Sequence, residues 1–332
     1  MRLGFVLAGA AALPAAEFAG IVRETEARRY HTAWTGETGG YDAIAVMATM
    51  LAHSTTLHVG SAVMPVQTRT PTLLGMSAAT LGHLAPGRVA FGLGLSSRII
   101  VEQWHGQKFA PALAQIREAV QIIRLVTAGE RVNFDGAFYR VRNFRLTAPA
   151  APVRIVLAAL GPEMLELAGE VADGVVLNWI PPQAVPAAIA HLQAGARRAA
   201  RSLDDFEIAC FIRTCVTDDV KTARAALARD ITGYVIVDVY ASFFRTAGFG
   251  AEVDAVNARW KAGDRAGAVG EISPRMLDGL GVVGDEAFAR ARIDAFARAG
   301  LTMPVVLPFN PAVAAGGDPR PTLLRTLRAF GD

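Results

Sequence analysis

The chain has 332 residues, of which 52% are hydrophobic and 19% charged, a balance that excludes a disordered or low-complexity protein. Its formal net charge is +3 and its basic residues are scattered, so the charge pattern gives no sign of a nucleic-acid partner. No apolar run reaches the roughly 18 residues that a membrane-spanning helix requires, and we expect no membrane partner.

The chain begins with an apolar stretch, residues 3–13, that imitates a short signal peptide. The competing interpretation is a buried strand followed by a helix that starts near Pro14. The strand is favoured because an identical rhythm of strand and helix follows at once.

Short apolar runs alternate with longer amphipathic ones almost from end to end. The short runs predict eight strands, at Leu3–Ala8, Thr32–Gly36, Leu57–Met64, Val89–Leu93, Arg154–Ala158, Gly174–Leu177, Glu207–Val216 and Pro304–Leu307. Strands this continuously apolar suit a parallel sheet whose outer face is covered by helices. One helical pattern is Leu113, Ile116, Val120 and Ile123, whose spacing makes a single apolar stripe.

Eight strand–helix units predict an α/β fold, a (β/α)8 TIM barrel, which needs about 250 residues and leaves about 80 for insertions. We expect one domain over residues 1–332, with a smaller helical addition at Trp179–Ala200. The longest insertion, residues 218–284, lies between strands seven and eight. Its pattern predicts helices that are interrupted near Gly248 and Gly263. An open doubly wound sheet is the alternative, but eight regular units favour closure.

Catalytic and ligand-binding residues of such a barrel lie at the carboxyl ends of its strands, so the residues that follow each strand are candidates for the functional site. Glu37 enters a glycine-rich loop after strand two, where it either contacts a ligand or fixes the loop by hydrogen bonds. Small residues near Ala62 and Val63, after strand three, would let a flat ring approach the backbone. His105 lies in a loop after strand four, where it either faces substrate or is structural.

Two further exits could hold an anion. The segment Gly94-Leu95-Ser96 could bind a phosphate or a polar tail, although it has neither the dinucleotide fingerprint nor the phosphate-binding loop. After strand five, Ala159-Leu160-Gly161-Pro162 leads into a helix whose first turn suits Pro162. Exposed backbone N–H groups at a positive helix end form an anion site, and a tight strand-to-helix turn is the alternative.

The sequence lacks the motifs of metal-dependent, Schiff-base, glycosidase and serine-hydrolase catalysis. The six histidines have no metal-ligand spacing, so we expect no metal. No lysine follows a predicted strand, no pair of carboxylates stands at the strand exits, and no nucleophile elbow occurs. A barrel of this kind takes its reactivity from a cofactor. Cys210 and Cys215 are too far apart along one extended strand for a disulfide, which predicts free thiols and a cytoplasmic protein.

The strand exits together resemble the luciferase-like oxidoreductase superfamily, specifically its coenzyme F420-dependent, methylenetetrahydromethanopterin reductase-like branch. The segments that carry this resemblance are Trp34–Glu37, Arg88–Gly94, Trp104–Gly106, Ala158–Pro162 and Ala172–Val175. They are dense over residues 1 to about 180, and the rest of the chain agrees more loosely.

The resemblance implies a deazaflavin ring against a bulge after strand three, with a non-prolyl cis peptide bond near Ala62-Val63. It implies that the cofactor contacts Ala62, Val63, Gly94, Leu95, Ser96, Ala159, Leu160, Gly161 and Pro162, with the phosphate against the last two segments. Substrate would lie near Glu37, His105 and Trp179, of which Glu37 and His105 are the candidate catalytic residues. Members of this family commonly pair through helices near strands two and three, which implies a homodimer.

Three positions depart from relatives. Thr38 and Ser97 stand where sugar-phosphate dehydrogenases of this branch have a histidine and a glutamate, which argues against that substrate. Leu95 replaces the arginine of luciferase, which weakens the case for FMN. The leading hypothesis is therefore hydride transfer between F420 and a small organic substrate. The alternatives are an FMN-dependent, oxygen-using monooxygenase and a non-catalytic flavin-binding barrel.

Overall fold

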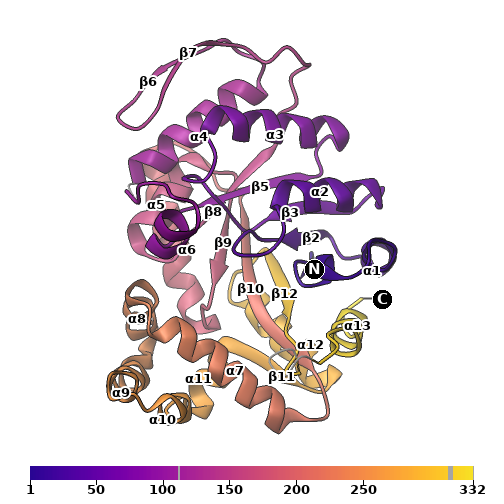
Figure 1. Cartoon of the computed structure of the whole chain (residues 1–332), viewed down its shortest axis with the longest axis vertical. Helices are drawn as coiled ribbons and strands as arrows, with labels where there is room; N and C mark the ends of the chain where they lie inside the picture. The colour runs from indigo at the N-terminus through magenta and orange to yellow at the C-terminus, as the bar shows by residue number, and fades with distance from the viewer. Residues whose placement is uncertain (111–112, 313–316, 332) are drawn as a thin grey trace. The chain divides into compact units, whose positions relative to one another are not determined.

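The computed structural model describes residues 1–110, 113–312 and 317–331 (Figure 1). Its strands are β1 (Gly4–Val6), β2 (Thr32–Thr35), β3 (His58–Ser61), β4 (Met64–Pro65), β5 (Val89–Gly94), β6 (Val132–Asp135), β7 (Arg140–Phe144), β8 (Arg154–Ala158), β9 (Gly174–Asn178), β10 (Glu207–Val216), β11 (Gly281–Gly284) and β12 (Met303–Pro308). Its helices are α1 (Ala15–Ala27), α2 (Ala43–Ala52), α3 (Pro71–Leu84), α4 (Leu113–Thr127), α5 (Pro162–Val171), α6 (Val185–Arg198), α7 (Val220–Val235), α8 (Asp238–Phe244), α9 (Gly250–Lys261), α10 (Arg265–Gly270), α11 (Pro274–Leu280), α12 (Glu286–Arg298) and α13 (Arg320–Arg328).

The main sheet follows the order β11-β10-β12-β1-β2-β3-β5-β8-β9, and β10 also pairs with β9. The eight predicted strands correspond to β1, β2, β3, β5, β8, β9, β10 and β12, and they form a closed parallel barrel with surrounding helices. The prediction of a TIM barrel is confirmed.

Two compact units make up the chain. The first holds residues 2–176 and 190–209, and the second holds Met1, residues 177–189 and the described residues from Cys210 on. The expectation of one domain over residues 1–332 stays a prediction.

In the first unit, β3 and β5 approach one another unusually closely. A Cβ at Gly92 would lie 1.7 Å from the carbonyl oxygen of Ser61, so only glycine fits there. The Ser61 hydroxyl donates to the carbonyl oxygen of Gly92 at 3.1 Å and accepts from the Gly92 N–H at 2.8 Å. This contact fixes the two strands whose carboxyl ends lead to the predicted cofactor segments.

The strands β6 and β7 form an antiparallel hairpin that the sequence reasoning missed (Figure 1). The carboxylate of Glu118 on α4 accepts backbone N–H groups from Ala137, Phe138 and Tyr139 at 2.7–3.0 Å. These bonds hold the turn of the hairpin against α4, and Val132, Phe134 and Val141 of the hairpin pack on apolar side chains of the same helix.

The second unit contains the predicted long insertion. Helices α7–α11 lie there, and the chain turns with positive φ at Gly248 (93°) and Gly263 (81°), where breaks were predicted. The insertion ends in a strand rather than a helix, because β11 pairs with β10 from Arg213 opposite Gly281 onward. A four-residue apolar run is too short for periodicity to identify as a strand.

Within the described residues, no helix is long and apolar enough to cross a membrane. Cys210 and Cys215 are both free and buried. Burial raises the pKa of the Cys210 thiol to about 12 and that of Cys215 to about 11. A cytoplasmic location stays a prediction.

Candidate functional site

Three of the predicted cofactor segments meet at neighbouring strand ends of the first unit. Met64 pairs with Leu93 and Pro65 with Gly94, while Leu93 pairs with Leu157. A Cβ at Gly94 would lie 2.6 Å from Val63 Cγ2 and 3.4 Å from Ala158 Cβ. The absence of a side chain at Gly94 therefore lets the three segments come together.

The backbone after β3 has the predicted cis peptide bond, which joins Ala62 and Val63. Both residues are half-buried, whereas Gly60 and Ser61 directly before them are buried. A Cβ at Gly36 would lie 3.0 Å from the carbonyl oxygen of Ala62, so the loop after β2 adjoins the same place. Leu95 and Ser96 are likewise half-buried and follow β5 directly.

The amino end of α5 is open. Gly161 is its N-cap, with φ −90° and ψ 163°, and no side chain caps the helix. A Cβ at Gly161 would meet no atom within 4 Å. By contrast, the side chains of Asp42 and Thr70 cap α2 and α3. The end of α5 therefore keeps N–H donors and space for an anion, beside Ala159 and Leu160 of the preceding turn.

Glu37 is held by groups of its own unit. Its two carboxylate oxygens accept from Arg69 Nη1 at 2.5 Å and Nη2 at 2.9 Å, and Oε2 also accepts from the Ala43 N–H at 3.1 Å. Arg69 contacts Asp42 as well, and both hydrogen bonding to Glu37 and the neighbouring carboxylates raise the pKa of Arg69. This geometry favours the loop-fixing alternative for Glu37. Sequence reasoning missed Arg69, which carries no local motif.

His105 follows a π-helix, Ile99–Trp104, and is exposed together with Trp104. A Cβ at Gly39 would lie 3.4 Å from the Trp104 ring, which places the residues after β5 next to the loop after β2. The exit segments of the first unit thus gather at one end of its strands, as predicted.

A second group of polar side chains lies in the second unit, around Trp179. This residue follows the last residue of β9, has a left-handed backbone (φ 57°) and is 1% exposed. The Arg213 guanidinium stacks 3.6 Å from the centre of its ring. Among the described residues, none accepts a hydrogen bond from the buried Trp179 Nε1. An unpaired buried donor costs about 1–3 kcal/mol, so this atom requires an explanation.

Arg213 is itself buried and bound on several sides. Its Nε lies 3.3 Å from Asp230 Oδ2, Nη1 donates to the side-chain oxygen of Asn178, and Nη2 donates to the Tyr234 hydroxyl at 3.3 Å. Arg213, a charged residue in the mostly apolar run Ile208–Val216, was the signal that could have revealed this group from sequence.

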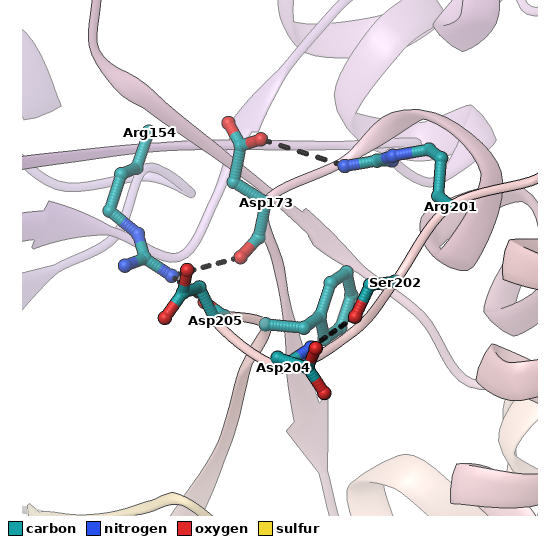
Figure 2. Close-up of a pocket in the computed structure, with 7 residues that line it drawn as sticks. Arg154, Asp173, Arg201, Ser202, Asp204 and Asp205 are labelled. Carbon is teal, nitrogen blue, oxygen red and sulfur yellow. Dashed lines mark hydrogen bonds and ion pairs between the residues drawn. The ribbon is translucent and has the colours of Figure 1, made fainter.

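The opposite, amino ends of the strands hold a polar pocket of about 360 Å³ in the first unit (Figure 2). Arg154, the first residue of β8, donates to the carbonyl oxygens of Asp173 and Asp205, and Arg201 lies 3.8 Å from the Asp173 carboxylate. These bonds join the loops that precede β9 and β10. Because barrel enzymes work at the carboxyl ends of their strands, we assign this pocket a structural role.

Among the described residues, no group of three or more His, Cys, Asp or Glu side chains could hold a metal ion.

Comparison with known families gives a match to luciferase-like monooxygenases over residues 1–303.

Two relatives illustrate the similarity. The chain is 31% identical to a Mycobacterium tuberculosis protein named provisionally as a coenzyme F420-dependent oxidoreductase, over 92% of this chain and 94% of that protein. It is 28% identical to the 5,10-methylenetetrahydromethanopterin reductase of Archaeoglobus fulgidus, over 78% and 79% of the two chains.

Solved structures agree on the fold. The F420-dependent tetrahydromethanopterin reductase of Methanopyrus kandleri matches with a TM-score of 0.76 and 20% identity over 95% of each chain. An F420-dependent secondary alcohol dehydrogenase, solved with an F420–acetone adduct, matches with a TM-score of 0.78 and 17% identity over 100% of this chain and 99% of that one. The resemblance stated from the strand exits is confirmed.

Proposed function

Because the chain belongs to the luciferase-like monooxygenase family, we propose that it transfers a hydride between coenzyme F420 and a small organic substrate. Relatives are named as F420-dependent oxidoreductases, reductases and dehydrogenases, so the chain is an oxidoreductase of this type. The observation that carries the proposal is the meeting of the segments at Val63, Gly94 and Ala158 beside the uncapped end of α5.

The residues present fit F420. The half-buried Ala62 and Val63 would lie against the deazaflavin ring, and Gly94 leaves room for that backbone. Gly94, Leu95 and Ser96 would lie beside the phosphate, and the space at Gly161 would admit it to the N–H groups of α5, with Ala159, Leu160 and Pro162 shaping the turn. When bound, F420 accepts or donates a hydride at C5 of its ring.

On the substrate side, Glu37 and His105 are our candidates for polar helpers. Exposed His105 is free to turn toward a ligand, whereas Glu37 acts by holding the loop after β2 through Arg69. The chain would contribute ring positioning and exclusion of water, rather than a nucleophile.

Substitution of Gly161 tests the site, because it separates folding from binding. Gly161→Asp adds a good N-cap to α5 and should raise stability by a few tenths of a kcal/mol. The same carboxylate would occupy the space of the phosphate, and like-charge repulsion should weaken F420 binding about tenfold or more, about 1.4 kcal/mol. Fluorescence titration with F420 measures the affinity, and thermal unfolding measures the stability.

Gly161→Asn is the matched control, since it caps the helix without a charge. We expect it to keep the gain in stability and to lose less affinity than the Asp variant. Equal F420 affinity in the wild type and Gly161→Asp would contradict the phosphate position. Wild-type protein that binds FMN but not F420 would contradict the cofactor, and cofactor binding without turnover of any substrate would leave a non-catalytic barrel.

We further propose a homodimer that pairs through α2 and α3. Neither helix contains Asp, Glu, Lys or Arg. Leu73, Met76 and Leu84 on α3 are nonetheless 41–57% exposed, with Thr80 between them on the same helical face. An uncharged face with exposed large side chains is typical of a surface that a second copy covers.

A further inference from the structure

A cluster of ionisable side chains lies at the amino ends of the barrel strands, at the opposite end from the candidate cofactor segments. Its members all belong to the first unit and are Arg2, His31, His58, Arg88, Arg154 and Glu207. His58 begins β3, Arg88 directly precedes β5 and Arg154 begins β8. The parallel pairing of these strands brings their first residues to the same end of the unit. We call the six residues the amino-end cluster.

Two stacked histidine rings lie within reach of the arginines. The centroids of the His31 and His58 rings are 4.4 Å apart. Burial is the largest cause that lowers the pKa of each ring, and the charges of Arg2 and Arg154 lower both further. Arg88 also lowers the pKa of His58. Three guanidinium groups therefore act on one pair of imidazoles.

Positive charge in the cluster exceeds the negative charge that the described residues supply there. The one carboxylate of the cluster is Glu207, which is 5% exposed and whose Oε1 has no hydrogen-bond partner among the described residues. Burial raises the pKa of this carboxyl, against the opposing effect of Arg154 and Arg2, so folding favours its neutral form. The nearby carboxylate of Asp173 is already bonded to Arg124 (Figure 2). The cluster therefore lacks a counterion of its own.

Several N–H donors of the cluster are unused. Arg2 is exposed and has no hydrogen bond or ion pair with any described residue. Nη2 of Arg154 donates to two carbonyl oxygens, whereas its Nη1 has no partner in the described part of the chain. His31 contacts the Thr32 hydroxyl through Nδ1, which leaves Nε2 available. Donors on converging cations are suited to an oxyanion, whose oxygens accept several charge-assisted hydrogen bonds.

We propose that the amino-end cluster binds a small, doubly charged oxyanion of the sulfate or phosphate type, held by Arg2, Arg88 and Arg154 and by the two histidines. The half-buried rings and the exposed Arg2 leave the cluster open to solvent. This site differs from the phosphate position proposed beside α5, because the two lie at opposite ends of the strands. It does not depend on the identity of the cofactor.

Binding of the anion should be coupled to the uptake of protons. A negative charge beside the imidazoles favours their protonated form and so opposes the burial and the arginines that lower the pKa values of the empty site. Protonation of Glu207 would act in the same direction. The affinity for the anion should therefore rise as the pH falls, by up to about tenfold per pH unit for each proton taken up.

Histidine ring resonances of protein labelled with 13C-histidine test the proposal, with sulfate as the probe because its charge stays constant near neutral pH. The resonances of His31 and His58 are assigned by their loss in His31→Gln and His58→Gln. At constant ionic strength, sulfate should move both resonances in a saturable way and leave exposed His83 in place. Calorimetry should show sulfate binding at least about threefold tighter at about pH 5.5 than at about pH 7.5.

One pair of variants separates the cluster from general attraction to a basic protein. Arg2→Gln removes a cation that no described residue binds, and it should weaken sulfate binding by about threefold or more. Arg23→Gln is the matched control, because it removes an exposed arginine of α1 that acts on neither histidine. Inorganic phosphate and glycerol phosphate, compared at one pH, distinguish a free ion from a phosphate ester as the tighter ligand.

Three results would overturn the proposal. The first is a chloride titration that moves the His31 and His58 resonances as sulfate does. The second is a sulfate shift that does not saturate, and the third is equal sulfate affinity in Arg2→Gln and Arg23→Gln. A saturable shift that is specific to sulfate, strengthens with acid and weakens in Arg2→Gln alone would establish the site.

Discussion

Glu37 and Arg69 illustrate how one ion pair determines the position of a loop. Both side chains are mostly buried, and the pair joins the loop after β2 to the residue before the N-cap of α3. If Glu37 fixes the loop, Glu37→Gln and Arg69→Met should each lower the free energy of unfolding. In a double-mutant cycle, the loss of unfolding free energy in the double variant should be smaller than the sum of the two single losses by about 1–3 kcal/mol.

Chemical denaturation of the two single variants and the double variant measures this coupling. Strictly additive losses of unfolding free energy would show that the two side chains act independently. Contact of Glu37 with a ligand would then be the favoured alternative. Glu26→Gln and Arg69→Met provide an unrelated pair, because Glu26 caps the Thr55–Leu57 backbone instead.

His31 and His58 form a stacked pair at the amino ends of β2 and β3, with ring centroids 4.4 Å apart. Burial, followed by repulsion from His58, Arg2 and Arg154, lowers the pKa of His31 to about 4. Burial and then Arg88, Arg154 and Arg2 lower the pKa of His58 as well. Folding therefore opposes protonation of both rings.

Stability should fall when the solution is acidified. The unfolded chain takes up the proton near pH 6.5 and the folded chain only near pH 4, so the stabilising contribution of neutral His31 is complete above pH 6.5 and is lost toward pH 4. Because the ring is half-exposed, we expect a loss of about 1 kcal/mol. Urea unfolding between pH 7 and 5 should show a shallower decline in His31→Gln than in the wild type or in a variant of exposed His83. Parallel curves would refute the assignment.

At the scale of elements, the uncharged faces of α2 and α3 make a prediction about assembly. Leu73→Glu places a charge on the exposed face of α3 and should convert the dimer to a monomer, since burying an unpaired carboxylate in an interface is strongly unfavourable. Light scattering after gel filtration measures the mass. Val239→Glu, at an exposed apolar position on α8, should leave the dimer intact. A wild-type monomer at micromolar concentration would contradict the proposed interface.

The same scale shows what the sequence could predict. The eight barrel strands are short and mostly apolar, because both faces of a parallel barrel strand are covered, and all eight were predicted. The hairpin β6–β7 was not found, because its apolar side chains pack on the helix α4 and its turn is held by Glu118. Periodicity does not encode a contact between distant elements.

For the candidate site, the strand-end segments were predictable from the sequence and their distant side-chain partners were not. Glycines and small residues at strand ends predicted a close approach of backbones, and the structure shows one between Gly94 and Val63. That these segments contact a cofactor stays a prediction. The partners of Glu37 and Trp179 were not predictable. Arg69 and Arg213 reach them through the tertiary fold, from positions that are 32 and 34 residues away in the chain.

For the whole molecule, cofactor binding should appear as a gain in stability. A ligand present at 100 times its dissociation constant adds about 2.7 kcal/mol to the free energy of unfolding. Thermal unfolding should therefore shift upward in a concentration-dependent way with F420 and not with equal FMN. A shift with FMN alone would favour the monooxygenase alternative.

The two cysteines have a practical consequence for chemistry on the surface. Both are buried and their pKa values are raised, so alkylating reagents at neutral pH meet almost no thiolate on the folded protein. One cysteine introduced at an exposed position such as Thr38 would then be the one thiol of the folded chain that reacts readily at neutral pH. A dye, a spin label or an electrode tether could be attached beside the candidate site without first removing any natural residue.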